Sequence, residues 1–150
     1  IDAKAEKLLD DSGYPGMKIL QFAFPGEDNL DRPHHYTQNS VAYTGTHDND
    51  VVNGWYEKLS ESERKLVSEY LNRRDDETIT KAMIRGIYSS VSDYAIVTMQ
   101  DLLDKDATSR MNVPSTVGGN WEWRMVAEDL TEERKEFLRN ITVRYSRERV

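Results

Sequence analysis

Short apolar runs alternate along this chain with longer stretches in which apolar residues recur at helical spacing. Three apolar runs predict buried strands, at residues 17–24, 41–44 and 94–99. The helical spacing predicts helices at residues 2–11, 51–59, 60–71, 75–91 and 131–146. Strands separated by helices favour parallel pairing, so the sequence predicts an α/β fold.

Polar residues indicate where several of these elements begin. Ser60-Glu61-Ser62-Glu63 has the form of a capping box, in which the serine accepts the Glu63 amide and the Glu63 carboxylate reaches back. The acidic residues 75–77 predict the start of the next helix, where negative charge interacts favourably with the helix dipole. Long irregular stretches cover residues 25–40 and 104–128. Loops at strand C-terminal ends carry the functional sites of barrels and open α/β sheets, so we look for chemistry there.

The composition is that of one globular domain, because the 150 residues are 37% hydrophobic and 31% charged. The net charge of −7 leaves no evident basic face for nucleic acid, and no apolar run approaches the roughly 20 residues that span a membrane. The absence of cysteine excludes disulfide and thiolate chemistry, and we expect a cytoplasmic protein. No signal peptide is visible, and a start at Ile1 indicates a processed, truncated or excised chain.

The densest group of polar residues that directly follows a strand lies at residues 46–50. A glycosidase needs two carboxylates about 5 to 10 Å apart that flank one bond. Asp48 and Asp50 are neighbours on one short turn, and such neighbours rarely reach a sugar from opposite sides. We therefore interpret this group as part of a site. The alternative is that Asn49 or Asp50 only caps the helix that follows.

Three histidines raise the question of a metal site. His34, His35 and His47 would be its nitrogen ligands, together with the nearby carboxylates. However, adjacent histidines point apart in most backbones, and no His-x-x-x-His spacing occurs. We therefore predict no metal, and expect a histidine that forms hydrogen bonds in a polar pocket. Glycine loops that bind phosphate and a nucleophile elbow are also missing from the sequence.

Aromatic side chains are candidates for stacking on the apolar faces of glucose rings. The chain offers Tyr36, Tyr43, Trp55, Tyr56, Trp121 and Trp123. For each of them, the alternative is ordinary packing in the core or on the surface. Trp55 and Trp121 lie beside polar loops, which favours stacking. We select Tyr36, Trp55 and Trp121 as candidates for substrate binding.

A set of segments, ordered along the chain, carries a family resemblance. The most distinctive segment is Tyr43-Thr44-Gly45-Thr46-His47-Asp48-Asn49-Asp50. The others lie at residues 15–24, 33–36, 54–56, 100–103, 110–114 and 119–124. Together they resemble the amylomaltases, the 4-α-glucanotransferases of glycoside hydrolase family 77. The resemblance covers nearly the whole chain, and ordered motifs are far more specific than any single match.

The resemblance implies a TIM (β/α)₈ barrel, of which residues 1–150 form the C-terminal part with about three parallel strands and no second domain. It implies transfer of α-1,4-glucan segments to an acceptor by a retaining double displacement, without a cofactor. Maltooligosaccharides and α-glucan are the expected partners. Three strands cannot close a barrel, so we expect the fragment to associate with itself through open sheet edges.

The resemblance also assigns roles to residues. Asp48 is the third carboxylate of the family, which holds the sugar and stabilises the transition state. His47 binds sugar hydroxyls next to the bond that is cut, and Asn112 is a further sugar contact. The nucleophilic Asp and the acid/base Glu belong to earlier strands, with the Glu just before the helix at residues 2–11. The isolated fragment is therefore expected to be inactive.

Three departures from the family pattern, and two other functions, remain open. Pro25-Gly26 follows the first strand where the family usually has Asp, and Glu27 or Asp28 are candidates to replace that sugar contact. His35 stands in place of the family's Asn, and Ser115 in place of Gly, which predicts a different turn near Asn112. One alternative function is a non-catalytic carbohydrate-binding or assembly module. The other is a metal-dependent hydrolase that uses His34, His47, Asp48 and Asp50.

Overall fold

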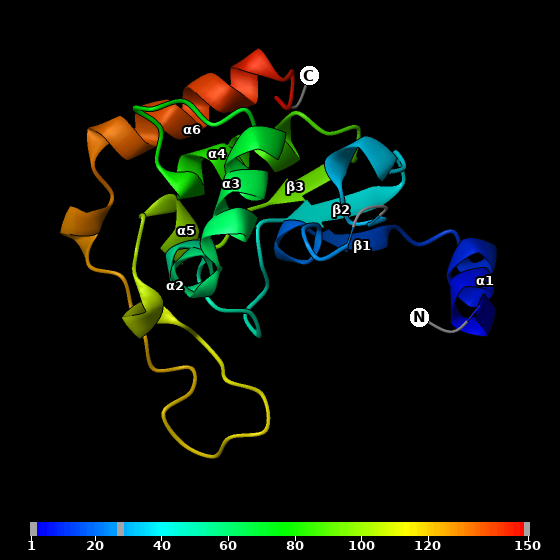
Figure 1. Ribbon diagram of the computed structural model, residues 1–150, viewed down its shortest axis with the longest axis horizontal. Helices are drawn as coiled ribbons and strands as arrows, with labels where there is room; N and C mark the ends of the chain where they lie inside the picture. The colour runs from blue at the N-terminus through cyan, green and yellow to red at the C-terminus, as the bar shows by residue number, and fades with distance from the viewer. Residues whose placement is uncertain (1–2, 27–28, 149–150) are drawn as a thin grey trace.

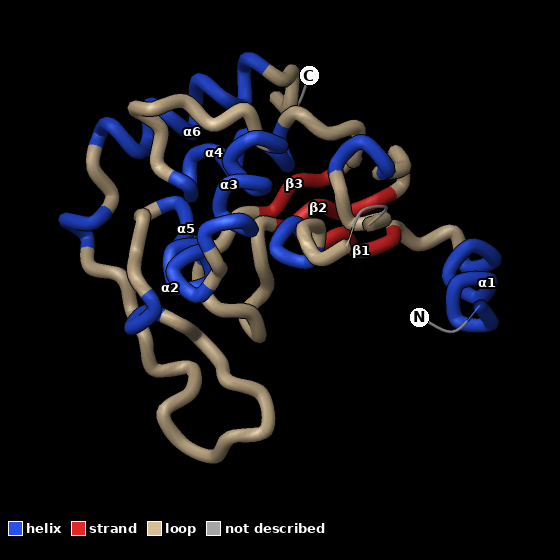
Figure 2. The backbone as a smooth tube through the Cα atoms, in the orientation of Figure 1, coloured by secondary structure: helices blue, strands red, loops and turns tan. Residues whose placement is uncertain are grey.

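The computed structural model, which describes residues 3–26 and 29–148, contains a parallel sheet with helices around it (Figures 1 and 2). The strands are β1 (Gly16–Ile19), β2 (Ser40–Tyr43) and β3 (Tyr94–Ile96), and they pair in that order. The register places Ile19 opposite Tyr43 and Tyr43 opposite Ile96. The prediction of an α/β fold with three parallel strands is confirmed.

The helices of the described residues are α1 (Ala3–Ser12), α2 (Val52–Lys58), α3 (Glu61–Tyr70), α4 (Ile79–Tyr88), α5 (Met99–Leu102) and α6 (Glu132–Arg144). Helix α4 contacts α2, α5 and α6, and it lies between the sheet and α6. Helix α1 stands apart from the other elements, at the opposite end of the molecule from α2 and α5 (Figure 1). None of the described helices is long and apolar enough to cross a membrane.

The hydrophobic core lies between the sheet and helices α2, α3 and α4. Helix α4 contributes most of it, because Ala82, Met83 and Ile87 recur at helical spacing and have no exposed surface. A Cβ atom added at Gly86 would lie 2.9 Å from a Leu71 methyl and 3.2 Å from a Leu20 methyl. Glycine at this position therefore allows the helix to approach its neighbours closely.

Several predicted elements are shorter than the apolar pattern indicates. The first strand ends at Ile19, and a 3₁₀ turn (Leu20–Phe22) follows in place of the predicted strand to residue 24. Its partner β2 ends at Tyr43, opposite Ile19, so no further residues of β2 are available for pairing. Leu20 remains fully buried, which shows that the apolar run indicates burial and not extended structure.

The boundaries around α4 and β3 also differ from the prediction. Helix α4 begins after Thr78, whose hydroxyl accepts the Lys81 amide, so the acidic residues 75–77 precede the helix. The helix ends at Tyr88, which leaves Val91 outside it and 61% exposed. Strand β3 ends at Ile96, and the short helix α5 takes up Met99, the last residue of the predicted strand, and the three residues after it. Thr98 caps α5 by accepting the Asp101 amide.

The capping box of α3 is confirmed and supports a stability prediction. The Ser60 hydroxyl accepts the Glu63 amide at 3.3 Å, and the Glu63 carboxylate accepts the Ser60 amide at 2.8 Å. Replacing Ser60 by Ala is expected to lower the free energy of unfolding by about 1 kcal/mol. Urea denaturation followed by tryptophan fluorescence measures this change. Ser62→Ala, at an exposed position of the same helix turn, should change the unfolding midpoint less, and equal effects of the two variants would contradict the prediction.

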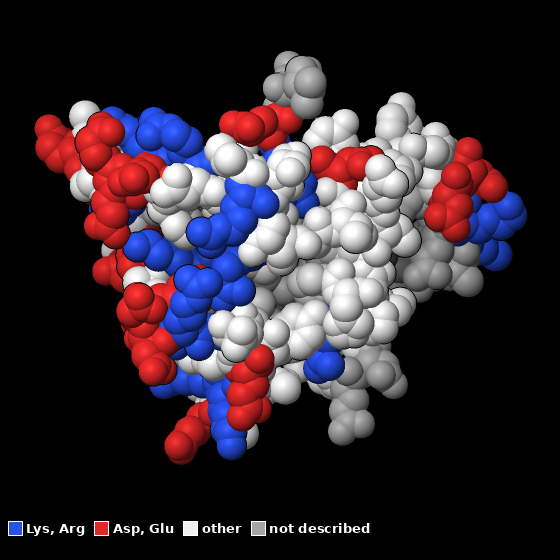
Figure 3. Space-filling model, turned by 90° about the horizontal axis from the view of Figure 1, so that it is seen from above, with Lys and Arg blue, Asp and Glu red and all other residues white. Residues whose placement is uncertain are grey.

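Basic and acidic side chains lie next to one another over the left part of the face shown in Figure 3, whereas most of the rest of that face is uncharged. Ion pairs of the described residues include Lys135 with Glu132 at 2.6 Å and Lys81 with Glu133 at 2.9 Å.

Candidate functional site

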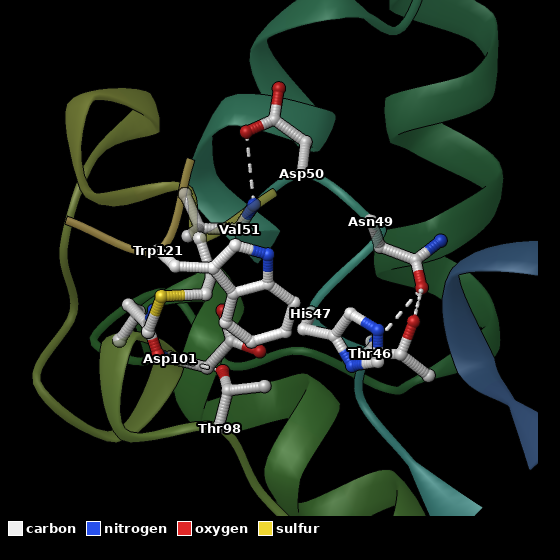
Figure 4. Close-up of a pocket in the computed structure, with 11 residues that line it drawn as sticks. Thr46, His47, Asn49, Asp50, Val51, Thr98, Asp101 and Trp121 are labelled. Atoms are coloured by element: carbon white, nitrogen blue, oxygen red, sulfur yellow. Dashed lines mark hydrogen bonds between the residues drawn. The ribbon is translucent and has the colours of Figure 1, made fainter. Parts of the chain in front are cut away.

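A cavity of about 220 Å³ lies at the carboxyl ends of β2 and β3 (Figure 4). Its walls come from residues 45–47 and 49–51 of the loop after β2, from the Thr98–Asp101 turn after β3, and from Met111 and Trp121 in the long loop that follows. The carboxyl ends of parallel strands are where the loops of α/β proteins build their sites. The cavity therefore lies where the sequence places the candidate chemistry.

Hydrogen bonds inside the loop at residues 45–51 fix its shape. The Asn49 side-chain carbonyl oxygen accepts the amide and the hydroxyl of Thr46, both at 2.8 Å. The Gln21 side chain, which is only 4% exposed, donates to the Asp50 carbonyl at 2.8 Å. The loop is therefore tied within itself and to the turn after β1.

Neither Asn49 nor Asp50 acts as the N-cap of α2. The N-cap is Val51, which has no side-chain capping bond. The Asp50 carboxylate accepts the Val51 amide at 2.9 Å and also binds Lys58. Figure 4 shows this carboxylate turned away from His47. The interpretation of Asn49 or Asp50 as the N-cap is therefore wrong, although the Asp50 carboxylate does bond the Val51 amide just before the helix.

Asp48 lies between His47 and Asn49, which both line the cavity, and is the point where the predicted site residues meet. The Asn112 side-chain amide donates to Asp48 Oδ1 at 2.6 Å, and His47 Nε2 lies 3.4 Å from the same oxygen. About half of each of the His47 and Asp48 side chains is exposed. The structure therefore brings together three residues that lie as far apart in sequence as positions 47 and 112.

Arg110 and a backbone hydrogen bond join the loop that carries His47 and Asp48 to the segment that carries Asn112. The Arg110 guanidinium donates to the Asp48 carbonyl at 2.7 Å and to the Asn112 carbonyl at 2.9 Å. The Asn112 amide donates to the His47 carbonyl at 3.1 Å. These bonds use backbone atoms of His47 and Asp48, so both side chains are left to face outward.

Trp121 covers one side of His47. The two ring centroids are 5.0 Å apart with an angle of 41° between the planes, and Figure 4 shows the indole beside the imidazole. Trp121 has a φ of 65°, which is rare for a bulky residue, and its amide donates to the Met111 carbonyl at 2.7 Å. Ser115, which replaces the usual glycine, also has a positive φ of 65°, a conformation that glycine adopts at less cost.

Two predicted sugar-binding residues do not join this cavity. Tyr36 is 6% exposed and belongs to the hydrophobic core, where no sugar reaches its ring, and burial raises the pKa of its hydroxyl. Trp55 packs against Phe24 with ring centroids 5.8 Å apart. Both side chains therefore follow the packing alternative in this structure. Glu27 and Asp28, the candidates for a further sugar contact, lie outside the described residues.

Asp101 is a buried residue of the cavity that the sequence did not single out. It is 2% exposed, and burial raises the pKa of its carboxyl above the ordinary value, although hydrogen bonds from Thr44 and the Val52 amide act in the opposite direction. The sequence signal that could have drawn attention to Asp101 was Thr98-x-x-Asp101, a pattern typical of the start of a helix. A buried carboxylate that bonds two other elements can be recognised only when the tertiary structure is known.

No group of three or more His, Cys, Asp or Glu side chains among the described residues is arranged to hold a metal ion. His34, one of the proposed ligands, instead bonds the Tyr70 hydroxyl at 2.7 Å, and its ring lies 4.0 Å from the His35 ring at an angle of 48°. Asp50 binds Lys58. The structure does not gather the four residues of the metal-hydrolase alternative, so nothing in it favours that function.

Comparisons with known proteins agree on one family. A family model described as 4-alpha-glucanotransferase matches residues 1–130. A 4-alpha-glucanotransferase of Streptococcus pneumoniae is 50% identical over 143 residues, which cover 94% of this chain and 28% of the relative. A chloroplastic/amyloplastic 4-alpha-glucanotransferase of Solanum tuberosum is 44% identical over 138 residues, covering 89% of this chain and 24% of the relative.

A solved structure supports the same relationship in three dimensions. The amylomaltase from Streptococcus agalactiae in complex with acarbose matches with a TM-score of 0.94 and 52% identity, covering 97% of this chain and 30% of that chain. This match confirms the predicted fold class, an α/β portion of a (β/α)₈ barrel. The chain spans less than a third of the length of each of these relatives.

Proposed function

This chain belongs to the 4-alpha-glucanotransferase family, and we propose that it forms part of an enzyme that transfers α-1,4-glucan segments to an acceptor sugar. In the proposed retaining double displacement, an enzyme carboxylate first replaces the leaving sugar, and an acceptor hydroxyl then replaces the enzyme. The substrates are maltooligosaccharides or longer α-glucans, and no cofactor takes part. Family membership confirms the resemblance that the ordered motifs indicate.

The observation that carries this proposal is the convergence of His47, Asp48 and Asn112 at one exposed point. Two side chains, Asn112 and His47, approach Asp48 Oδ1, at 2.6 and 3.4 Å. Among the described residues, no donor bonds Asp48 Oδ2. A half-exposed carboxylate with one oriented oxygen and one oxygen open to solvent is suited to accept a hydrogen bond from a sugar hydroxyl.

These side chains would act by binding the transition state more tightly than the substrate. In glycosyl transfer the ring flattens and gains positive charge, and nearby bonds to ring hydroxyls strengthen at that moment. Asp48 supplies a fixed negative charge for this step, and His47 supplies a ring nitrogen beside it. Trp121, which is 52% exposed, offers an apolar plate for the face of a neighbouring glucose.

We propose that the nucleophile and the acid/base lie in the larger part of the enzyme that this chain does not span. Residues 1–150 then form the C-terminal part of one catalytic barrel, without a second domain. A retaining mechanism needs its two carboxylates about 5 Å apart on either side of the bond. Asp48 alone cannot meet this requirement, so the isolated chain is expected to be inactive.

A transfer assay on the complete enzyme tests the proposal. With maltotriose as the only substrate, the enzyme should release glucose and form longer maltooligosaccharides, and NMR should show the α-anomer in the newly formed bonds. Acarbose, which is bound in the Streptococcus agalactiae relative, should inhibit the reaction. Hydrolysis without longer products, or inversion of the anomer, would contradict the proposal.

A carbohydrate-binding or assembly module is the competing function, and it predicts a different result. Such a module would bind maltooligosaccharides through residues 1–150 alone, and calorimetry of this chain measures that affinity directly. Binding by the chain together with no transfer by the complete protein would replace our proposal. Transfer by the complete protein with no binding by the chain supports it.

We further predict that the isolated chain associates with itself. Within the described residues, β1 and β3 are the edges of the sheet, and their exposed side chains include Met17 at 60% and Tyr94 at 59%. Unpaired strand edges with apolar side chains pair readily with other chains. Size-exclusion chromatography with light scattering should show dimers or larger species, and a clean monomer over a wide concentration range would argue against this prediction.

We propose a cytoplasmic location for the complete enzyme. The sequence has no cysteine, so its stability does not depend on disulfides that a reducing compartment would break. The Solanum tuberosum relative is named as chloroplastic/amyloplastic, which makes a plastid the alternative compartment. Fractionation of the source cells, followed by immunodetection of the enzyme, distinguishes the two.

A further inference from the structure

Asp101 is a buried carboxylate in α5 that the proposed reaction does not use directly. Its Oδ2 accepts the Thr44 hydroxyl at 2.6 Å, and its Oδ1 accepts the Val52 amide at 2.8 Å. Thr44 has no exposed surface, and Asp101 is 2% exposed. Hydrogen bonds to a charged group in a buried setting are among the strongest that a protein forms.

The two bonds reach opposite ends of one loop. Thr44 directly follows β2, and Val52 is the first residue of α2. Residues 45–51 lie between them and carry Asp48 and His47. One carboxylate, supplied by the helix after β3, is therefore bonded to the residues that flank the loop on both sides.

We propose that Asp101 is a positioning residue that clamps both ends of this loop and so fixes Asp48 beside the cavity. The inference deepens the proposed function, on which its catalytic consequence rests. Asp101 does not need to touch the sugar for this role. It acts through the loop, whose internal bonds from Thr46 to Asn49 carry a displacement of either end to Asp48.

The remaining contacts show why the clamp matters for the position of Asp48. Arg110 and Asn112 bind the outer side of the loop, through the Asp48 carbonyl and carboxylate. Asp101 holds the same loop from its buried side. Asp48 is therefore held between an exposed and a buried set of bonds, and without the two Asp101 bonds the buried side of the loop would keep the Gln21 bond to the Asp50 carbonyl but lose its anchors at both ends.

Thr44→Val in the complete enzyme tests the clamp at one end. Valine keeps the shape of threonine but has no hydroxyl, and the Asp101 bond to Val52 remains. We expect kcat for maltotriose transfer to fall about tenfold or more with KM nearly unchanged, because small misplacements of a catalytic group are costly. Thr44→Ser, which keeps the hydroxyl, should restore kcat to within about threefold of the unsubstituted enzyme.

Thr80→Val is the matched control. The Thr80 hydroxyl is also buried and also donates to a carboxylate, Asp104, but this bond lies outside the loop. Both valine variants are expected to lower the melting temperature, whereas only Thr44→Val should lower kcat. A Thr44→Val enzyme with unchanged kcat and a lowered melting temperature would show that Asp101 merely satisfies buried donors, and would overturn the proposal.

Hydrogen exchange followed by mass spectrometry provides a readout besides activity. Amides at residues 45–51 should exchange about tenfold faster or more in Thr44→Val than in Thr80→Val. Equal exchange in the two variants would overturn the clamp, whether or not the enzyme transfers glucan. If the unsubstituted enzyme shows no transfer, the proposed function fails while the exchange result still decides the clamp. If Thr44→Val does not fold, Asp101→Asn applies the same two measurements.

Discussion

Replacing Asp48 by Asn in the complete enzyme is expected to lower kcat for glucan transfer by about a thousandfold with little loss of folding. The substitution removes a negative charge that the positively charged transition state needs, while it keeps the size of the side chain. About half of the Asp48 side chain is exposed, and Arg110 holds the Asp48 backbone independently of the carboxylate. The loop should therefore keep its place. Steady-state kinetics with maltotriose, together with the melting temperature, measures both parts of the prediction.

Asp106→Asn supplies the control for a simple loss of charge. Asp106 is an exposed carboxylate at the start of the next 3₁₀ turn, where it accepts both the amide and the hydroxyl of Thr108. This variant should retain kcat within about twofold of the unsubstituted enzyme. If Asp48→Asn kept about a tenth or more of kcat, or if both variants lost activity equally, Asp48 would not be the transition-state carboxylate that we propose.

The position of the site was predictable because it depends only on the order of apolar and polar segments along the chain. Each apolar run contains a strand, although the strand is shorter than the first and third runs, and polar residues that follow a strand lie at its carboxyl end. The group at residues 46–50 was found in this way. In contrast, the meeting of Asp48 with Asn112 joins two βα units, and only the family resemblance indicated it before the structure was known.

Other features depend on tertiary contacts that no local pattern contains. Periodicity did not distinguish a sugar-stacking ring from a core ring, so Trp55 and Tyr36 were selected although both pack with core residues. The Asp101 carboxylate follows a strand in the same way as Asp48, yet Asp101 is buried and Asp48 is exposed. The burial of such a side chain depends on which helices cover the turn. Helix α5, which carries Asp101, was itself too short to predict from the sequence.

The ion pair between Glu77 and Arg85 is expected to be the most important polar contact for stability among the pairs of the described residues. Two parallel bonds join the side chains, at 2.9 and 2.7 Å, and the guanidinium also donates to the Leu71 carbonyl. The exposed fractions of the two side chains are 10% for Glu77 and 17% for Arg85. Burial raises the pKa of Glu77, but the bonds and charge of Arg85 outweigh burial and hold that pKa below its ordinary value.

Arg85→Gln should lower the free energy of unfolding at pH 7 by about 2 to 3 kcal/mol, because it leaves the Glu77 carboxylate largely buried without its partner. Lys65→Gln is the control, since Lys65 pairs with Glu69 at 3.7 Å on an exposed face and its loss should change stability by less than about 0.5 kcal/mol. Urea denaturation of the chain, followed by tryptophan fluorescence, measures both variants.

The dependence of this loss on pH has a definite sign. The folded pKa of Glu77 is lowered, so the pair stabilises the protein fully above the unfolded pKa of about 4.3, and this stabilisation disappears as the pH falls through the folded pKa. In Arg85→Gln the carboxylate lacks its partner and takes up a proton more readily. The difference in stability between the unsubstituted chain and Arg85→Gln should therefore be largest near neutral pH and shrink below about pH 4. A difference that stays constant on acidification would show that Arg85 stabilises the fold through its carbonyl contacts and not through the Glu77 carboxylate.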